Sequence, residues 1–229
     1  MVSGIGASDD ALSRVVRYHR PARPGEPPFS SLSFTLEDGA WAWLVGPTGQ
    51  RSDPTLDSIL DLSPPPEGRL EVFGQDARQS GRSMRRRLRR RIGLVRLQPD
   101  PFIHLPVLAA TALPAWAAAG VWSNAERQSR EILSWLGLDS RRNALVHALD
   151  LDGRWRVALA RALVNAPQLV LAEEPGRDLA PALRKTFLGK LQEANAAGMA
   201  VLATVDEASL PDGFIGSAIR VPPQPEIAT

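Results

Sequence analysis

The amino-acid sequence predicts an α/β protein in which helices cover a mainly parallel sheet. In the second half of the chain, a strong helix at 155–165 leads into the apolar strand 169–172, and a helix at 179–197 leads into the strand 200–205. Near the start, the apolar run 41–45 (WAWLV) is followed by a glycine-containing loop and a short helix. This alternation is typical of a parallel sheet that binds ligands at the carboxyl ends of its strands.

The other elements follow from the same two periodicities, apolar residues every second position in strands and every third or fourth in helices. The turn signal Glu37–Asp38–Gly39 follows a predicted strand at 31–36, and the prolines at 64–66 end the first predicted helix. The predicted elements are a half-buried strand at 31–36, a short helix around 56–60, a strand at 69–73, a basic helix at 84–91, a strand at 92–95 and an alanine-rich helical region at 102–148 with its clearest amphipathic piece at 126–136.

The composition is that of an ordinary globular protein. The chain has 229 residues, of which 44% are hydrophobic and 23% charged, enough for one large domain or two small ones. It has no cysteine, which excludes disulfides and thiolate zinc sites. Lys185 and Lys190 are the only lysines, so a mechanism with a Schiff base or a lysine general base is excluded at any other position of the chain. The start of the chain has no secretory signal pattern, which favours a cytosolic location.

Two stretches admit more than one interpretation. The uncharged segment 105–121 is short for a bilayer span and is interrupted by Pro106 and Pro114, so we expect it to be part of a soluble domain. The arginine run 85–91 is best interpreted as a solvated helix face, with attraction to anionic lipid as the second interpretation. Nucleic-acid binding is third, because the run has no interleaved aromatics and the net charge is only +2.

One long stretch carries a family resemblance. The run RVALARALVNAP at 156–167, followed by LVLAEEP at 169–175, resembles the most recognisable part of ABC-type ATPases. With RIGLV at 91–95, His104–Leu105 and ALP at 112–114, the chain looks most like the cell-division FtsE type, and the lipoprotein-releasing type comes second.

The resemblance implies a fold and a set of partners. It implies a single domain over 14–221, with a P-loop NTPase (RecA-like) core at 14–97 and 156–221, a helical subdomain at 98–155 and a flexible tail at 222–229. It also implies a cytoplasmic subunit that forms a homodimer, or a heterodimer with another ABC ATPase, and that lies on the inner face of the membrane through an FtsX-type permease. The segment 105–122, with Trp116 and Trp122, is the best candidate for the permease contact.

The loop after the strand 41–45 has the position of a phosphate-binding loop, whose pattern is GxxxxGK[ST]. Arg51, Ser52 and Asp53 stand where the pattern has glycine, lysine and a hydroxyl. Asp53 followed by Pro54 is a favourable helix start, so we expect the Asp53 carboxylate to take the amides that a phosphate uses. Alternatively, Arg51 supplies the missing charge. The degenerate loop comprises Gly46, Gly49, Arg51, Ser52 and Asp53. ATP and Mg²⁺ are the cofactors that the resemblance implies, and these replacements argue against their binding.

The signature and strand-end motifs are altered to different degrees. The signature segment aligns with LDLDG at 149–153, where Asp150 and Asp152 bring carboxylates toward the γ-phosphate and Gly153 ends the motif. Glu173 corresponds to the aspartate on the magnesium side, and Glu174 to the general base. The alternative, of equal weight, is that this glutamate pair is simply solvated at the sheet edge.

Three further positions correspond to nucleotide contacts of the family that the chain resembles. Val205 stands where the family has its switch histidine. The glutamine before the helical region corresponds to Leu97, or to Gln98 if the chain has a one-residue bulge. Tyr18 is the candidate for stacking on adenine, with ordinary packing as its alternative.

The altered positions are those that bind phosphate or carry catalysis, while the apolar strands and the helix 155–165 are kept. The sequence therefore predicts a catalytically impaired pseudo-ATPase that binds and positions an FtsX-type permease in cell division or envelope processes. One alternative is an active ABC ATPase with a non-standard site that uses Glu174 as base and Arg51 for phosphate. The other is a nucleic-acid-binding protein that uses 85–91.

Overall fold

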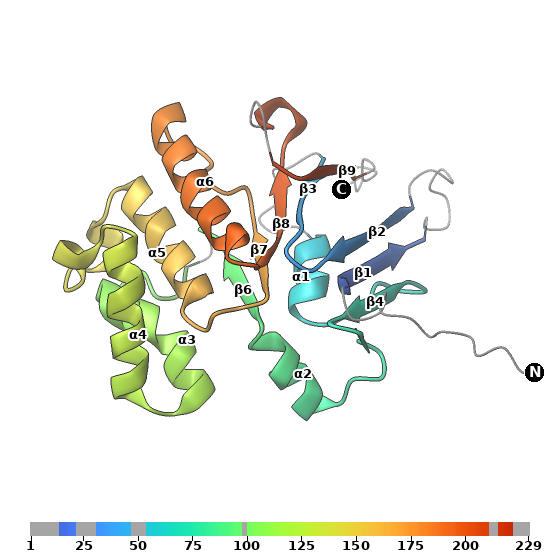
Figure 1. Ribbon diagram of the computed structural model, residues 1–229, viewed down its shortest axis with the longest axis horizontal. Coiled ribbons are helices and arrows are strands. Elements are labelled where there is room, and N and C mark those ends of the chain that lie inside the picture. Colours follow the sequence, from blue (N-terminus) through green and yellow to red (C-terminus); the bar gives the residue numbers. More distant parts are fainter. Residues whose placement is uncertain (1–13, 22–30, 47–53, 98–99, 211–214, 222–229) are drawn as a thin grey trace, which may run out of the picture.

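The structure is a computed structural model that describes residues 14–21, 31–46, 54–97, 100–210 and 215–221. Figure 1 shows the arrangement of its strands and helices. The elements are β1 (Arg14–Arg20), β2 (Leu32–Glu37), β3 (Trp41–Val45), α1 (Pro54–Leu60), β4 (Arg69–Val72), β5 (Gln75–Asp76), α2 (Arg82–Arg89), β6 (Ile92–Val95), α3 (Val107–Ala119), α4 (Trp122–Trp135), α5 (Leu151–Leu163), β7 (Leu169–Ala172), α6 (Pro181–Ala196), β8 (Ala200–Val205) and β9 (Ser217–Arg220), with short 3-10 turns at Asp139–Arg141, Val146–Ala148 and Glu207–Ser209.

The predicted parallel sheet is present. Its strand order is β6-β7-β8-β3-β9, and every neighbouring pair is parallel. The register sets Val95 beside Ala172 and Val45 beside Val205. Because all the strands point the same way, their carboxyl ends meet at one edge.

The two faces of this sheet are buried against different layers, following the two-residue period of a strand. Leu44, Leu171 and Leu202 point toward α1 and the antiparallel sheet, and they pack in one apolar cluster with both. Trp43, Val170 and Ala203 point the other way and pack with α5 and α6. Figure 1 shows this sandwich, with α3 to α6 on one side of the parallel sheet and α1 with β1, β2 and β4 on the other.

A second sheet holds the first strands of the chain. It is antiparallel, with the order β2-β1-β4-β5. The strand predicted at 31–36 is β2 and lies in this sheet rather than in the parallel one. Its partner β1 was not predicted, and neither was β9 at the edge of the parallel sheet.

The region from Val107 to Trp135 forms two helices that pack on each other and on α5. The expectation that Pro114 interrupts this segment was wrong, since α3 runs through it, whereas Pro106 does precede the helix start. The helix expected at 155–165 begins earlier, at Leu151. Among the helices of the described ranges, none has both the length and the apolar character that crossing a bilayer requires.

Candidate functional site

The candidate site lies where β6 and β7 end, at the carboxyl edge of the parallel sheet. Arg96 follows the last residue of β6, and Glu173 follows the last residue of β7. The backbone N–H of Glu173 donates to the carbonyl of Val95 at 2.9 Å, so the two strand ends stay paired up to this point. The first turn of α1, which contains Asp57, faces them.

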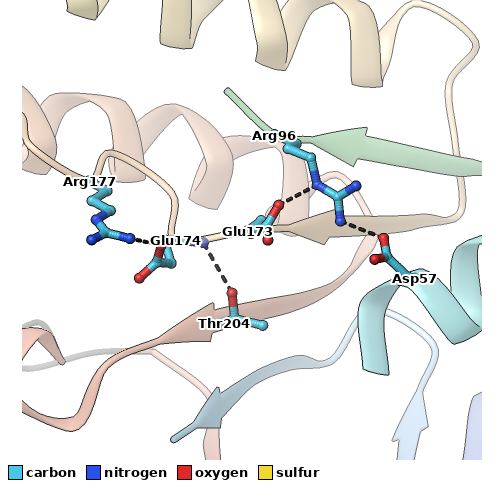
Figure 2. A network of polar contacts seen from close by, with 6 residues as sticks. All are labelled: Asp57, Arg96, Glu173, Glu174, Arg177 and Thr204. Atoms are coloured by element: carbon cyan, nitrogen blue, oxygen red, sulfur yellow. Dashed lines mark hydrogen bonds and ion pairs between the residues drawn. The ribbon is translucent and has the colours of Figure 1, made fainter. Parts of the chain in front are cut away.

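Arg96 is bonded to two carboxylates from different elements. Its Nε donates to Glu173 Oε2, and its Nη2 donates to Asp57 Oδ1 at 2.6 Å (Figure 2). The side chains of Arg96 and Glu173 are only 14% and 11% exposed. Burial disfavours the charged guanidinium, but the hydrogen bond to Asp57 and the charge of Glu173 outweigh it, so the pKa of Arg96 is raised.

Glu174 has its own arginine partner. Its carboxylate accepts from Nη1 of Arg177, three residues later, and its backbone N–H donates to the hydroxyl of buried Thr204 on β8 at 3.1 Å (Figure 2). The hydrogen bond to Glu174, reinforced by the charge of that carboxylate, raises the pKa of Arg177. Glu174 adopts φ +42°, in the left-handed region, so its backbone makes a sharp turn as the chain leaves β7.

The sequence placed Glu173 and Glu174 correctly at the end of a buried strand, but neither interpretation of the pair included arginine partners. Arg96 and Arg177 were missed as site residues. The signal for Arg96 is its position directly after the strand 92–95, one strand away from Glu173 in the sheet. The contact joins residues 77 positions apart, so only the strand order exposes it.

Of the residues predicted to form the phosphate loop, the structure describes only Gly46. Gly46 lies at the end of β3, and its N–H donates to the carbonyl of Val205 at 3.2 Å. A Cβ at Gly46 would lie 2.9 Å from Cβ of Val221, so a side chain would not fit without a shift. The other predicted loop residues, Gly49, Arg51, Ser52 and Asp53, lie outside the described residues, as does Gln98.

Two positions that the family resemblance assigns to the nucleotide site are buried in packing. Val205, at the position of the switch histidine, is buried in the apolar cluster under α5 and α6. Tyr18 is also buried, and its ring stacks on Phe34 of β2 with the centroids 5.3 Å apart. For Tyr18 the structure therefore contains the packing alternative rather than an open ring face for adenine.

The signature segment forms the start of α5. Asp150 is the N-cap residue, and its Oδ1 accepts from the backbone N–H of Gly153 at 2.8 Å. Asp152, in the first turn, is paired with Arg156 at 2.5 Å. A helix N-terminus attracts anions because its first amides have no partner within the helix. Here the chain's own carboxylate takes one of these amides, as we predicted for Asp53 at the other loop.

The Asp150 cap makes a modest, testable contribution to stability. We expect Asp150→Ala to lower the free energy of unfolding by about 1 kcal/mol, since the amide of Gly153 loses its acceptor. Urea unfolding of the purified chain measures this change. Asp150→Asn keeps a capping oxygen and is the control, and equal losses in both variants would contradict the capping role.

An arginine-lined cleft lies between α2, β6, α3 and α5. It has a volume of about 500 Å³, and the helix α3 contributes Pro114, Ala117 and Ala118 to its wall. The arginines that line it are Arg86, Arg89, Arg90, Arg96 and Arg161. The run 85–91 is therefore more than a solvated helix face, because three of its arginines face this cleft.

Not every arginine near this cleft is available to a partner. Arg161 is bonded to Asp100 at 2.9 Å, and its pKa is lowered by desolvation despite that carboxylate. Arg85, which does not line the cleft, donates to the carbonyls of Ser80 and Ala77. Arg86 and Arg90 are exposed to solvent on α2 and at its end.

Two exposed tryptophans lie close together on the helical region. Trp116 of α3 is 45% exposed and Trp122 at the start of α4 is 42% exposed. Their rings meet edge to face with the centroids 6.2 Å apart. Since Trp116 is adjacent in sequence to the cleft residue Ala117, an aromatic pair and a basic cleft lie at the same end of α3.

Among the described residues, no group of three histidine, aspartate or glutamate side chains is arranged to hold a metal ion. The carboxylates of Asp57 on α1 and Glu173 at the end of β7 share the guanidinium of Arg96.

Comparison with known proteins gives consistent matches. The family model described as ABC transporter matches residues 29–177. The lipoprotein-releasing system ATP-binding protein LolD 2 of Caulobacter vibrioides is 33% identical over 175 residues, which cover 75% of this chain and 76% of that protein. The cell division ATP-binding protein FtsE of Haemophilus influenzae is 28% identical, covering 84% and 87%. A dimeric ATP-binding cassette bound to ADP and phosphate is similar in fold, with a TM-score of 0.70 at 22% identity over 83% of this chain and 88% of that one.

Proposed function

The chain belongs to the ABC transporter family, and from this premise we propose that it is an ATP-binding-type subunit that has lost ATP hydrolysis and that docks on a membrane permease. The observation that carries the proposal is the pairing of both strand-end glutamates with arginines, Glu173 with Arg96 and Glu174 with Arg177. The FtsE type is one of several similar relatives, and the lipoprotein-releasing type is another.

The Glu174 pair argues against its use as a general base. A general base has to accept a proton from the attacking water at a free oxygen within hydrogen-bond reach. One carboxylate oxygen of Glu174 already accepts from Arg177. That oxygen is occupied by the guanidinium and is not free to take the proton of a water molecule.

The signature helix argues against γ-phosphate binding from a second subunit. The N-cap carboxylate of Asp150 takes the amide of Gly153, and Asp152, in the same turn, is paired with Arg156. A phosphate brought to this helix end would meet the Asp150 carboxylate in place of the Gly153 amide. Since a composite site in this family combines one subunit's loop with the other's signature, the proposal holds for a homodimer and for a heterodimer.

The docking surface that we propose consists of the exposed cleft arginines Arg86 and Arg90 together with the tryptophan pair Trp116 and Trp122. Aromatic side chains and arginines are the residues that most often anchor interfaces. Exposed Arg86 and Arg90 favour a partner segment that carries carboxylates. An FtsX-type permease, with the subunit on the cytoplasmic face of the membrane, is the partner that we propose from the FtsE resemblance.

The direct test of the catalytic part is ATP turnover. We expect the purified chain with Mg²⁺ and ATP to release phosphate at the background rate, alone and with a permease present. Glu174→Gln is expected to leave that rate unchanged, because Glu174 is not acting as base. Turnover above background that disappears in Glu174→Gln would show that the chain is an enzyme and would contradict the proposal.

A further inference from the structure

The strand-end carboxylates do not fit a magnesium ion. The family resemblance assigns the magnesium side of the site to Glu173. Mg²⁺ requires near-octahedral oxygen coordination at about 2.1 Å, through carboxylates, phosphates and water. In this chain Glu173 Oε2 accepts from Arg96, and the other end of the same guanidinium is bonded to Asp57. A divalent cation beside Glu173 would therefore face a fixed positive charge.

We propose that Arg96 is a built-in cation that takes the place of a divalent ion at this edge of the sheet. The inference concerns the same site as the proposed loss of hydrolysis and rests on it. Figure 2 shows the guanidinium lying between the end of β7 and the first turn of α1. It is paired with a carboxylate from each of these two elements.

Arginine suits this task for two physical reasons. Its guanidinium is planar and offers donors on different edges, so Nε and Nη2 reach carboxylates on two separate elements. It also stays charged at every accessible pH, and the raised pKa of Arg96 reinforces this. The ion pairs of Arg96 therefore connect α1, β6 and β7 without a metal ion or a nucleotide.

The test is a titration of the full chain with Mn²⁺, a paramagnetic probe for Mg²⁺ sites, followed by electron paramagnetic resonance. We expect no saturable Mn²⁺ binding to the wild type, and no change in its melting temperature with either Mn²⁺ or EDTA. Arg96→Gln removes the charge and is expected to bind Mn²⁺ saturably, at least about tenfold more tightly than the weak non-saturable contacts of the wild type. The double variant Arg96→Gln with Glu173→Gln is expected to lose that gain.

Arg177→Gln is the matched control, because it removes the neighbouring arginine from Glu174 and leaves the Arg96 pair intact. It is expected to behave as the wild type toward Mn²⁺. A folded Arg96→Gln that binds Mn²⁺ no better than the wild type would overturn the proposal. If Arg96→Gln does not fold, the wild type decides: saturable Mn²⁺ binding that Glu173→Gln removes would overturn the proposal, and its absence would support it.

The Mn²⁺ result and the turnover result are independent. Phosphate release by a chain that binds no Mn²⁺ without nucleotide would contradict the proposed function and leave the internal cation in place. Binding of Mn²⁺ at Glu173 in a chain without turnover would contradict the internal cation and leave the proposed function in place.

Discussion

Arg96→Met is expected to lower the free energy of unfolding by about 2–3 kcal/mol, because it leaves the carboxylate of Glu173 poorly solvated and without its cation. Glu173 is 11% exposed and Arg96 14% exposed, so water replaces the lost partner only in part. Asp57, the other partner, is 33% exposed and contributes less. Urea unfolding followed by circular dichroism measures the change.

Two further variants test whether the loss of stability comes from the buried Arg96–Glu173 pair. Arg177→Met removes an arginine that is 51% exposed, so we expect a loss of no more than about 1 kcal/mol. The double variant Arg96→Met with Glu173→Leu removes both charges and is expected to recover at least half of the loss, because no carboxylate is left unpaired at β7. An Arg96→Met protein as stable as the wild type would contradict the claim that the Arg96–Glu173 pair stabilises the fold.

Trp116→Ala is expected to weaken binding to an FtsX-type permease by about thirtyfold, which corresponds to about 2 kcal/mol for a tryptophan at the centre of an interface. The reason is the loss of a large apolar ring that is 45% exposed in the free chain and supported by Trp122. Binding to the permease in lipid nanodiscs, measured by biolayer interferometry without nucleotide, gives the affinity. Trp135→Ala is the matched control, since Trp135 is 37% exposed but is bonded to Glu193 and does not line the cleft.

The arginine part of this docking surface has its own readout. Arg86→Gln combined with Arg90→Gln is expected to reduce the association rate and its dependence on salt, because exposed charges steer a partner more than they hold it. Arg82→Gln removes a charge from the same helix outside the cleft lining and is the control. Binding that is insensitive to all of these variants would place the permease contact elsewhere on the chain.

Much of the fold could be predicted because it depends on local patterns. The helix α6 and the strand β8 lie within two residues of their predicted bounds, since each is a long run with one clear period. The strand β1 was not predicted, because its arginines and histidine mask an alternation that becomes clear only when it pairs with β2 and β4. Short β9 depends entirely on pairing with β3.

The position of the site could be predicted from the sequence, but the pairing of its glutamates with arginines could not. Glu173 and Glu174 follow a buried strand, and parallel topology sends them to the ligand edge. Their arginine partners depend on which strand lies next to β7 and on how the chain turns after Glu174, and neither is encoded in a local pattern. The capping idea applied to Asp53 appears in the structure at Asp150, where the same combination of aspartate and helix start occurs.

We propose that the chain's own arginines and aspartates occupy the positions at which nucleotide phosphates and a metal ion would otherwise bind. Isothermal titration of the purified full chain with ATP in the presence of Mg²⁺ tests it most directly. We expect no saturable binding below about 1 mM, the level of weak non-specific contacts. A dissociation constant in the micromolar range that depends on Mg²⁺ and is lost in Glu173→Gln would contradict it.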